Sequence, residues 1–227
     1  MLSKWQNLPD NLKNESVKKY YDALNRKRFE LKIKRLFDIF FSLVLIIILL
    51  PIFLVLSLII VLDSGVPVFY LQSRVTKNLK NFNIIKFRTM VNNADKIGSL
   101  VTTDNDCRIT RIGKLLRKFR LDELPQLFNI LGGSMSFVGT RPEVQKYVDA
   151  YNSEMLATLL LPAGVTSTAS IEYKDEAELL RASVNVDETY INEILPQKMK
   201  YNLEYLENFS LKTDLKIIFN TVFAVFK

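Results

Sequence analysis

The chain has 227 residues, of which 48% are apolar and 24% charged, a balance that excludes disorder and allows a sizeable core. The absence of histidine excludes a Ser-His-Asp triad, a histidine base and histidine-ligated zinc or haem iron. The single cysteine, Cys107, excludes an internal disulfide and a cysteine-rich metal site. Acid–base or metal chemistry must therefore rest on carboxylates, lysines, tyrosines or hydroxyl groups.

The net charge of +7 is unevenly distributed along the chain. Residues 1–35 carry a net +6 and residues 63–120 a net +8, whereas residues 121–227 carry a net −6. Such a basic front is typical of proteins with an anionic partner, such as phosphates, nucleic acid or an acidic membrane surface. Solvated faces of lysine and arginine would also explain part of this surplus.

The first 35 residues combine many charges with aromatic and leucine side chains at helical spacing. Examples are Trp5, Tyr20, Tyr21, Leu24 and Phe29. This pattern predicts an N-terminal interfacial helical segment over residues 1–35, which leads into a membrane.

Residues 39–62 form an uncharged apolar run. A straight helix of this length would measure about 36 Å, enough to cross a hydrocarbon core of ~30 Å. The run begins too late and is too long for a secretory signal, and no small-residue cleavage site follows it. We therefore expect residues 36–62 to insert into a membrane and residues 63–227 to form a separate domain.

A proline, Pro51, occupies the middle of this run and predicts a kink, because it lacks an N–H and clashes with the preceding turn. Basic residues flank both ends, with Lys34 and Arg35 before the run and Arg74 and Lys77 after it. The positive-inside rule would keep both flanks in the cytoplasm. A re-entrant hairpin and a spanning helix both stay open on these features. Lys34 and Arg35 are interpreted as headgroup anchors.

The remaining elements follow from shorter patterns. Residues 68–72 and 82–87 are predicted to be the two strands of a hairpin. Residues 108–120 form a basic amphipathic stretch that either lies on lipid headgroups or covers a core. Residues 174–210 are expected to be helical with an interruption at Pro196. The last stretch places Leu215, Ile218, Val222 and Phe226 on one helix face, and we favour a membrane interface for it.

Two adjacent carboxylates stand in the string Leu121-Asp122-Glu123-Leu124-Pro125-Gln126-Leu127. Pro125 is well placed in the first turn of a helix that runs to Leu131. Asp122 and Glu123 would then precede a helix N-terminus, where backbone N–H groups also favour phosphate. Such a pair can hold Mg²⁺ and leave one oxygen for attack or proton transfer. By pattern alone, an ordinary capped helix start is the commoner explanation.

Basic residues also stand beside apolar or turn residues in Lys86-Phe87-Arg88 and Arg141-Pro142. These side chains could clamp diphosphate oxygens, or they could simply be charges at strand ends and turns. The glycines form neither a dinucleotide-binding motif nor a phosphate-binding loop of the Walker type.

An ordered set of motifs runs from about Lys34 to the C-terminus. The set comprises Lys34-Arg35-Leu36-Phe37-Asp38; Gly65, Pro67, Phe69, Gln72 and Arg74; Lys86-Phe87-Arg88-Thr89-Met90; Asp106-Cys107-Arg108-Ile109-Thr110; Gly113; Leu116-Arg117-Lys118; the string 121–127; Asn129, Leu131, Gly132, Met135-Ser136, Val138-Gly139, Arg141-Pro142, Pro162, Gly164 and Thr166. With these motifs the chain resembles the bacterial sugar transferases that are monotopic phosphoglycosyl transferases. It looks like the small, minimal form of that family, whose longer members carry extra transmembrane helices.

The chain departs from the family pattern at five positions. The family usually has glycine where Thr76 and Leu79 stand, and often aspartate, proline and glycine where Ser134, Thr140 and Ser167 stand. None of these positions belongs to the Asp-Glu pair.

The resemblance implies transfer of a sugar phosphate from a UDP-sugar to polyprenyl (undecaprenyl) phosphate with release of UMP. This reaction is the first membrane step of bacterial glycoconjugate assembly, for capsule, exopolysaccharide, O-antigen or glycoprotein. It implies that Asp122 attacks the β-phosphorus and forms a covalent phosphosugar intermediate. It also implies Mg²⁺ at Asp122 and Glu123, with Glu123 assisting in metal binding or proton handling. Four basic residues would bind substrate: Arg74, Lys86, Arg88 and Arg141.

The implied fold is α/β and largely helical. It combines a compact catalytic domain that has a short β-hairpin, a Pro-broken re-entrant membrane helix, and interfacial amphipathic helices that include the C-terminal one. The implied location is the bacterial inner membrane with the catalytic domain facing the cytoplasm, in contact with membrane lipids, and a homodimer stays open. The alternative is a non-catalytic membrane-anchored protein that binds acidic lipids or RNA. Residues 108–120 contain one aromatic residue, Phe119, so no nucleic-acid partner is expected.

Overall fold

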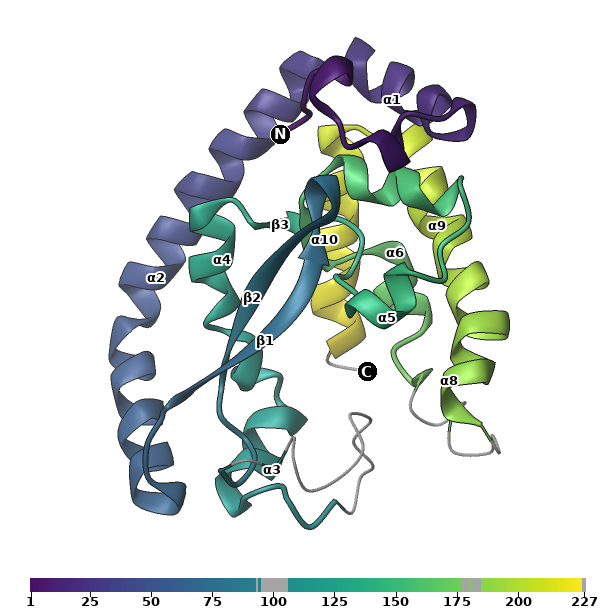
Figure 1. Cartoon of the computed structure of the whole chain (residues 1–227). Helices are drawn as coiled ribbons and strands as arrows, with labels where there is room; N and C mark the ends of the chain where they lie inside the picture. Colours follow the sequence, from purple (N-terminus) through teal and green to yellow (C-terminus); the bar gives the residue numbers. More distant parts are fainter. Residues whose placement is uncertain (93, 95–105, 177–179, 181–184, 226–227) are drawn as a thin grey trace.

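Helices dominate the computed structural model, which describes residues 1–92, 94, 106–176, 180 and 185–225 (Figure 1). The α-helices are α1 (Glu15–Arg26), α2 (Arg28–Ser64), α3 (Arg111–Lys118), α4 (Gln126–Gly132), α5 (Gln145–Val148), α6 (Thr168–Glu172), α8 (Val186–Thr189), α9 (Leu195–Glu207) and α10 (Leu211–Val225). Short 3₁₀ helices are η1 (Trp5–Asn7), η2 (Asp10–Leu12), η3 (Lys77–Leu79), η5 (Leu121–Glu123) and η6 (Met155–Leu160), and η7 (Tyr190–Ile194) is a π-helix. The strands are β1 (Phe69–Thr76), β2 (Lys80–Phe87), β3 (Met135–Val138) and β4 (Ala163–Thr166). The largely helical α/β prediction is confirmed.

The N-terminal segment packs on the domain instead of facing outward. The Asn14 side chain caps α1 by accepting a hydrogen bond from the Val17 amide. Tyr20, Tyr21 and Leu24 of α1 are buried in a core that also holds residues of η6, α9 and α10. We expected these three side chains to lie at a membrane interface, and that expectation is wrong because they are buried inside the protein. An amphipathic stripe has the same spacing whether it covers a protein core or a lipid surface.

The apolar run lies within α2, a continuous helix of 37 residues that includes Pro51. Among the described residues, α2 is the one helix long and apolar enough to cross a membrane. The helix runs through Pro51 without ending, so the predicted break of the membrane segment at this residue is wrong. Proline removes one N–H donor, which bends a helix without ending it when the residues on either side stay helical. Figure 1 shows α2 as a single bowed helix along one side of the domain.

The domain packs against α2 along one face. Phe53, two residues after the proline, contacts the rings of Phe87 and Phe128 at centroid distances of 5.5 and 5.7 Å. Most other side chains of the apolar run are exposed, among them Ile47, Ile48 and Leu54. The helix therefore presents a broad apolar surface on the side that faces away from the domain.

Lys34 and Arg35 do not serve as headgroup anchors, which corrects the expectation from sequence. Lys34 is 3% exposed, and its Nζ lies 2.5 Å from Oδ2 of Asp214 on α10. Arg35 donates to the carbonyl oxygens of Ile130 and Leu131 at 2.6 and 2.8 Å. These carbonyls lie at the C-terminal end of α4, where a helix lacks internal donors and favours a cation. Both residues therefore fasten α2 to the domain.

The predicted hairpin is confirmed and is longer than expected. β1 and β2 pair antiparallel from Phe69 opposite Phe87 to Thr76 opposite Lys80. In the turn between them Asn78 and Leu79 have φ of 59° and 58°. Leu79 therefore adopts the left-handed conformation that the glycine usual in the family would take without strain.

A second, parallel pair joins β3 to β4, and the sequence did not predict it. Each strand has only four residues, too few to show a pattern of alternation. Just beyond β3 the backbone of Gly139 passes so close to Gly164 that a Cβ on Gly164 would lie 2.1 Å from the Gly139 nitrogen. Only glycine allows this approach.

Of the stretch 174–210 that was expected to be helical, residues 186–207 are helical, whereas residues 177–179 and 181–184 lie outside the described residues. Pro196 does not interrupt a helix, because it lies in the first turn of α9, where a missing N–H costs nothing. On α10, Leu215 and Val222 are exposed as expected, whereas Ile218 is partly buried against the core. Phe226 lies outside the described residues.

Candidate active site

Asp122 and Glu123 lie in η5, between α3 and α4. The preceding residue, Arg120, has a φ of 57°, a left-handed conformation that is costly for a residue with a side chain. α4 begins at Gln126, which confirms the helix predicted after the pair. The two carboxylates therefore stand at a strained turn immediately before a helix.

Three cations surround Glu123. Its Oε1 lies 2.9 Å from Nη2 of Arg141, 3.4 Å from Nζ of Lys86 and 4.0 Å from Nη1 of Arg120. Burial alone would raise the pKa of Glu123, but the charges of Arg141 and Lys86 outweigh it and hold the pKa at about 2. Glu123 is therefore a permanently ionised, paired carboxylate.

Asp122 differs from its neighbour. It is 9% exposed, and its buried Oδ1 has no hydrogen-bond partner among the described residues. Burial raises the pKa of Asp122, and the adjacent charge of Glu123 raises it further, while Lys86 and Arg117 lower it in part. One carboxylate of the pair is thus satisfied by the protein, and the other keeps an oxygen for another partner.

A small polar cavity of about 20 Å³ is lined by Lys86 and Arg141, the two cations that pair with Glu123, although neither carboxylate belongs to its lining. Its lining comes from both sheets, from α4 and from the loop after β3: Gln72, Arg74, Ile84, Lys86, Gln126, Arg141, Pro142 and Gly164. Three of these side chains are cations. The sequence-predicted residues Arg74, Lys86 and Arg141 are therefore brought together, and they make the cavity suited to phosphate oxygens.

Gln126 is a residue of this cavity that sequence reasoning missed. It is 2% exposed, and its Oε1 is buried without a hydrogen-bond partner in the described part of the chain. In sequence Gln126 follows Asp122 by four residues, a spacing that would place both side chains on one face of a helix, and this is the signal that could have found it. Arg117 and Arg120, whose charges act on Asp122 and Glu123, were also missed as site residues.

Arg74 is fixed within the cavity wall by neighbouring side chains. Its guanidinium donates to Oε1 of Gln72 at 3.1 Å and lies 3.9 Å from Oε2 of Glu143. Glu143 is itself buried and accepts a hydrogen bond from the hydroxyl of Tyr190 at 2.5 Å. Glu143 therefore holds the Arg74 guanidinium close enough to Arg141 for the two charges to interact.

Arg88 lies elsewhere, so the structure does not support its predicted role in substrate binding. Its Nη2 donates to the carbonyl oxygen of Ser64 at 2.8 Å, to the Ser64 hydroxyl at 2.9 Å and to the carbonyl oxygen of Gly65 at 2.5 Å. These groups form the C-terminal end of α2, where unsatisfied carbonyls attract a cation. Arg88 therefore caps α2.

The donor set fits a divalent cation that is shared with a substrate. Within the described ranges, no group of three or more His, Cys, Asp or Glu side chains gathers. Glu123 is engaged with cations, but Asp122 offers an unpartnered carboxylate oxygen. Mg²⁺ is commonly held by one or two carboxylates together with phosphate oxygens, so a full protein cage is not needed.

Fold and site together define a class: a protein in which an apolar helix long enough to cross a membrane lies along a domain with a carboxylate pair and a cationic cavity. The sequence model of the family described as "Bacterial sugar transferase" matches residues 29–227. This chain belongs to the bacterial sugar transferase family.

Three relatives illustrate the family. The chain is 36% identical to the UDP-N-acetylgalactosamine-undecaprenyl-phosphate N-acetylgalactosaminephosphotransferase of Aeromonas hydrophila, over 84% of this chain and 43% of that protein. It is 37% identical to the UDP-glucose:undecaprenyl-phosphate glucose-1-phosphate transferase of Klebsiella pneumoniae, over 85% of this chain and 40% of that protein. It is also 37% identical to the exopolysaccharide production protein PSS of Rhizobium leguminosarum bv. phaseoli, over 85% of this chain and 94% of that protein. The chain thus spans about two fifths of the first two relatives and nearly all of the third.

Proposed function

We propose that this chain transfers a sugar phosphate from a UDP-sugar to polyprenyl (undecaprenyl) phosphate and releases UMP. Two of the relatives described above carry names that state a sugar-phosphate transfer to undecaprenyl phosphate. The observation that carries the proposal is the unequal pair: Glu123 is neutralised by Arg141 and Lys86, while Asp122 keeps a buried, unpartnered oxygen. A carboxylate can act as nucleophile without a histidine when a cationic site receives the phosphate under attack.

In the first step, an oxygen of Asp122 attacks the β-phosphorus of the UDP-sugar, and the bond from that phosphorus to UMP breaks. In the second step, an oxygen of polyprenyl phosphate attacks the same phosphorus and releases the Asp122 carboxylate. Arg74, Lys86 and Arg141 hold the phosphate oxygens throughout.

Glu123 takes the role of a fixed counter-charge in this proposal. With a pKa of about 2 it carries no proton near neutral pH, so it is unsuited to proton transfer. Its charge holds Arg141 and Lys86 beside Asp122 before substrate arrives. Because the two cations are already in position, they stabilise the charge that develops on the phosphate without a cost of reorganisation during the reaction.

Asp122 would hold Mg²⁺ together with the phosphate oxygens of the substrate, since Glu123 is already engaged. When bound, the cation supplies charge neutralisation between the attacking carboxylate and the phosphate.

We place the active site on the cytoplasmic face of the bacterial inner membrane, with both ends of the continuous helix α2 on that side. This topology is supported by a core that joins residues before α2 to residues after it. Leu12 and Val17 share one buried cluster with Val75 and Phe209. A spanning helix would separate these residues across a hydrocarbon core of ~30 Å.

The proposal is tested by supplying purified protein and Mg²⁺ with a panel of UDP-sugars labelled at the β-phosphorus. Without acceptor lipid, we expect UMP release in step with label retained on the protein. Asp122→Asn should retain no label, whereas Arg88→Lys, outside the site, should label as the unchanged chain does. Adding polyprenyl phosphate should then move the label to the lipid.

An absence of UMP release from every UDP-sugar in the presence of polyprenyl phosphate would favour the alternative of a non-catalytic lipid-binding protein. Equal labelling of the Asp122→Asn variant would remove Asp122 from the role of nucleophile.

A further inference from the structure

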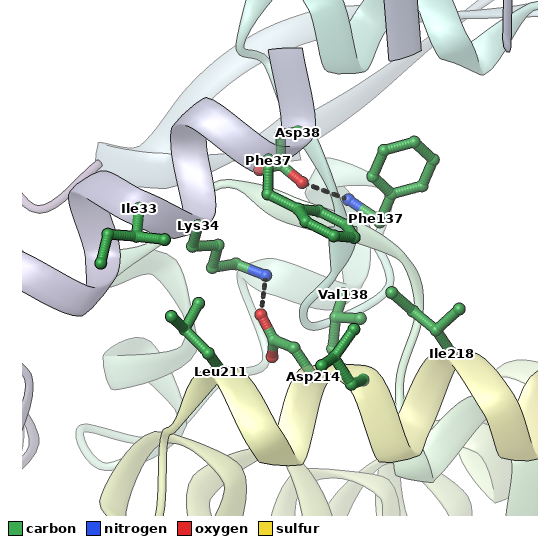
Figure 2. A pocket seen from close by; sticks show the side chains of 10 residues that line it. Ile33, Lys34, Phe37, Asp38, Phe137, Val138, Leu211, Asp214 and Ile218 are labelled. Atoms are coloured by element: carbon green, nitrogen blue, oxygen red, sulfur yellow. Dashed lines mark hydrogen bonds and ion pairs between the residues drawn. The ribbon is translucent and has the colours of Figure 1, made fainter. Parts of the chain in front are cut away.

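A second cavity, of about 130 Å³, lies between α2, β3 and α10 and is separate from the polar one (Figure 2). Three elements contribute to its lining: Ile33, Lys34, Phe37 and Asp38 from α2; Phe137 and Val138 from β3; and Leu211, Asp214, Leu215 and Ile218 from α10. Seven of these ten residues are apolar, so the cavity is suited to an apolar ligand.

The charged groups in the lining are engaged with protein partners. Figure 2 shows Lys34 and Asp214 pointing at each other, and Nζ of Lys34 lies 2.5 Å from Oδ2 of Asp214. The other Asp214 oxygen accepts from the Tyr205 hydroxyl at 2.7 Å. Oδ1 of Asp38 accepts from the Phe137 amide at 3.2 Å, whereas its buried Oδ2 has no hydrogen-bond partner among the described residues. The Lys34–Asp214 pair is therefore satisfied within the protein, and apart from one Asp38 oxygen the walls of the cavity are hydrocarbon.

The cavity opens onto an exposed apolar surface. Its rim residues Ile33 and Leu215 are 38% and 55% exposed. Beside them, Leu36 and Phe40 on α2 are also exposed, as is Phe219 on α10. This surface continues into the apolar run of α2, so the mouth of the cavity faces lipid when that run is inserted in a membrane.

The volume limits what the cavity can hold. An apolar cavity of about 150 Å³ accepts benzene, a ring of six carbons. A cavity slightly smaller than that has room for about five carbons, which is the size of one isoprene unit with its methyl branch.

β3 links this cavity to the active site. Val138 lines the apolar cavity, and Arg141, three residues later, lines the polar one. Three extended residues span roughly 10 Å. The backbone between them is fixed to β4, since the Gly139 amide donates to the Thr166 carbonyl at 3.0 Å and the Gly164 amide donates to the Thr140 carbonyl at 2.8 Å. A lipid whose phosphate reaches Arg141 therefore has its first isoprene units near the cavity.

We propose that the cavity between α2, β3 and α10 binds an isoprene unit near the phosphate end of the acceptor polyprenyl chain. The inference rests on the proposed function for the identity of the lipid. An acyl chain of the bilayer would fit the same walls, but only the acceptor lipid has its phosphate held about 10 Å away at Arg141. The cavity would then align the acceptor phosphate with the phosphorus carried by Asp122.

The test narrows the mouth of the cavity with Leu215→Trp and uses Phe219→Trp as the matched control. Both residues are exposed on α10, but only Leu215 lines the cavity. We expect Leu215→Trp to raise the KM for polyprenyl phosphate about ten-fold or more. Label retained from the UDP-sugar without acceptor should stay unchanged in both variants. An unchanged KM in Leu215→Trp would overturn the proposal.

A binding measurement separates this inference from the proposed function. A polyprenyl phosphate with a photoreactive group on its first isoprene units should crosslink to β3 or α10 of the full chain in detergent. Unlabelled polyprenyl phosphate should displace it, whereas a diacyl phospholipid should not. Equal displacement by the phospholipid would assign the cavity to bilayer acyl chains and overturn the proposal. This readout holds even if no UMP release is found.

Discussion

Glu123→Gln and Asp122→Asn are isosteric changes in adjacent residues, and the structure predicts that they shift Tm in opposite directions. Arg141 and Lys86 lower the pKa of Glu123 from its usual value near 4.3 to about 2, a difference that corresponds to about 3 kcal/mol of stability at neutral pH. Glutamine cannot balance the two cations. For a chain of this size, a loss of about 3 kcal/mol lowers Tm by roughly 6–12 °C.

Asp122→Asn should raise Tm, because burial and the charge of Glu123 both disfavour the ionised Asp122 side chain. The change removes the charge but keeps a buried polar group, so we expect a rise in Tm that is smaller than the fall expected for Glu123→Gln. The same change should abolish turnover, since an amide cannot act as the nucleophile. Stability and activity would thus move in opposite directions at one residue, as is common at active sites.

The pH dependence separates the two effects further. The stabilising contribution of Glu123 is complete above its unfolded pKa and is lost as pH falls toward about 2, so the deficit of Glu123→Gln should shrink between about pH 5 and 2. The raised pKa of Asp122 acts in the opposite direction, because the ionised side chain destabilises the folded chain once pH rises through that pKa. The gain in Tm of Asp122→Asn should therefore vanish as pH falls toward about 4. Thermal unfolding in detergent at several pH values measures both. A fall in Tm for both variants at neutral pH would refute this account of the pair.

Three further predictions concern other residues. Arg141→Lys keeps the charge but loses the fork that grips two oxygens, so kcat/KM in detergent should fall roughly ten- to a hundred-fold, or about 1.5–3 kcal/mol, and kinetics like those of the unchanged chain would reject the phosphate role. Gln126→Met removes a buried, unpartnered oxygen, so Tm should rise by roughly 2–4 °C while kcat/KM falls, and unchanged kcat/KM would exclude substrate contact by this amide. Single cysteines at Ser3 and Asn81, in a Cys107→Ser background, should be equally accessible to an impermeant thiol reagent in intact cells; labelling of one from outside would establish a spanning α2.

The sequence was sufficient to predict the apolar helix, the hairpin and the carboxylate pair. Each depends on information held within a short segment: an uncharged run, β-forming residues around a turn, and two carboxylates before Pro125 at a helix start. The strong local signals therefore placed three of the parts that build the site.

The sequence was insufficient where a side chain finds its partner far along the chain. Lys34 stands beside an apolar run, as a headgroup anchor would, but its partner Asp214 lies 180 residues later. Tyr20 and Leu24 have the spacing of an interfacial helix, yet α9 and η6 pack against α1 and bury them. Neither partner can be inferred from the local pattern, because amphipathic spacing does not identify what covers the apolar face.

Arg88 and Arg141 illustrate why a basic residue in a motif is ambiguous. In sequence both stand beside apolar or turn residues, and both were expected at the diphosphate. In the structure Arg88 is bound by the carbonyl oxygens at the end of α2, which use its donors and leave it buried, whereas Arg141 meets Glu123 and remains partly exposed toward the cavity. A guanidinium held by backbone carbonyls stabilises a helix end, and one held by a single carboxylate oxygen keeps further donors for a substrate. The identity of the acceptor therefore distinguishes a structural arginine from a substrate-binding one.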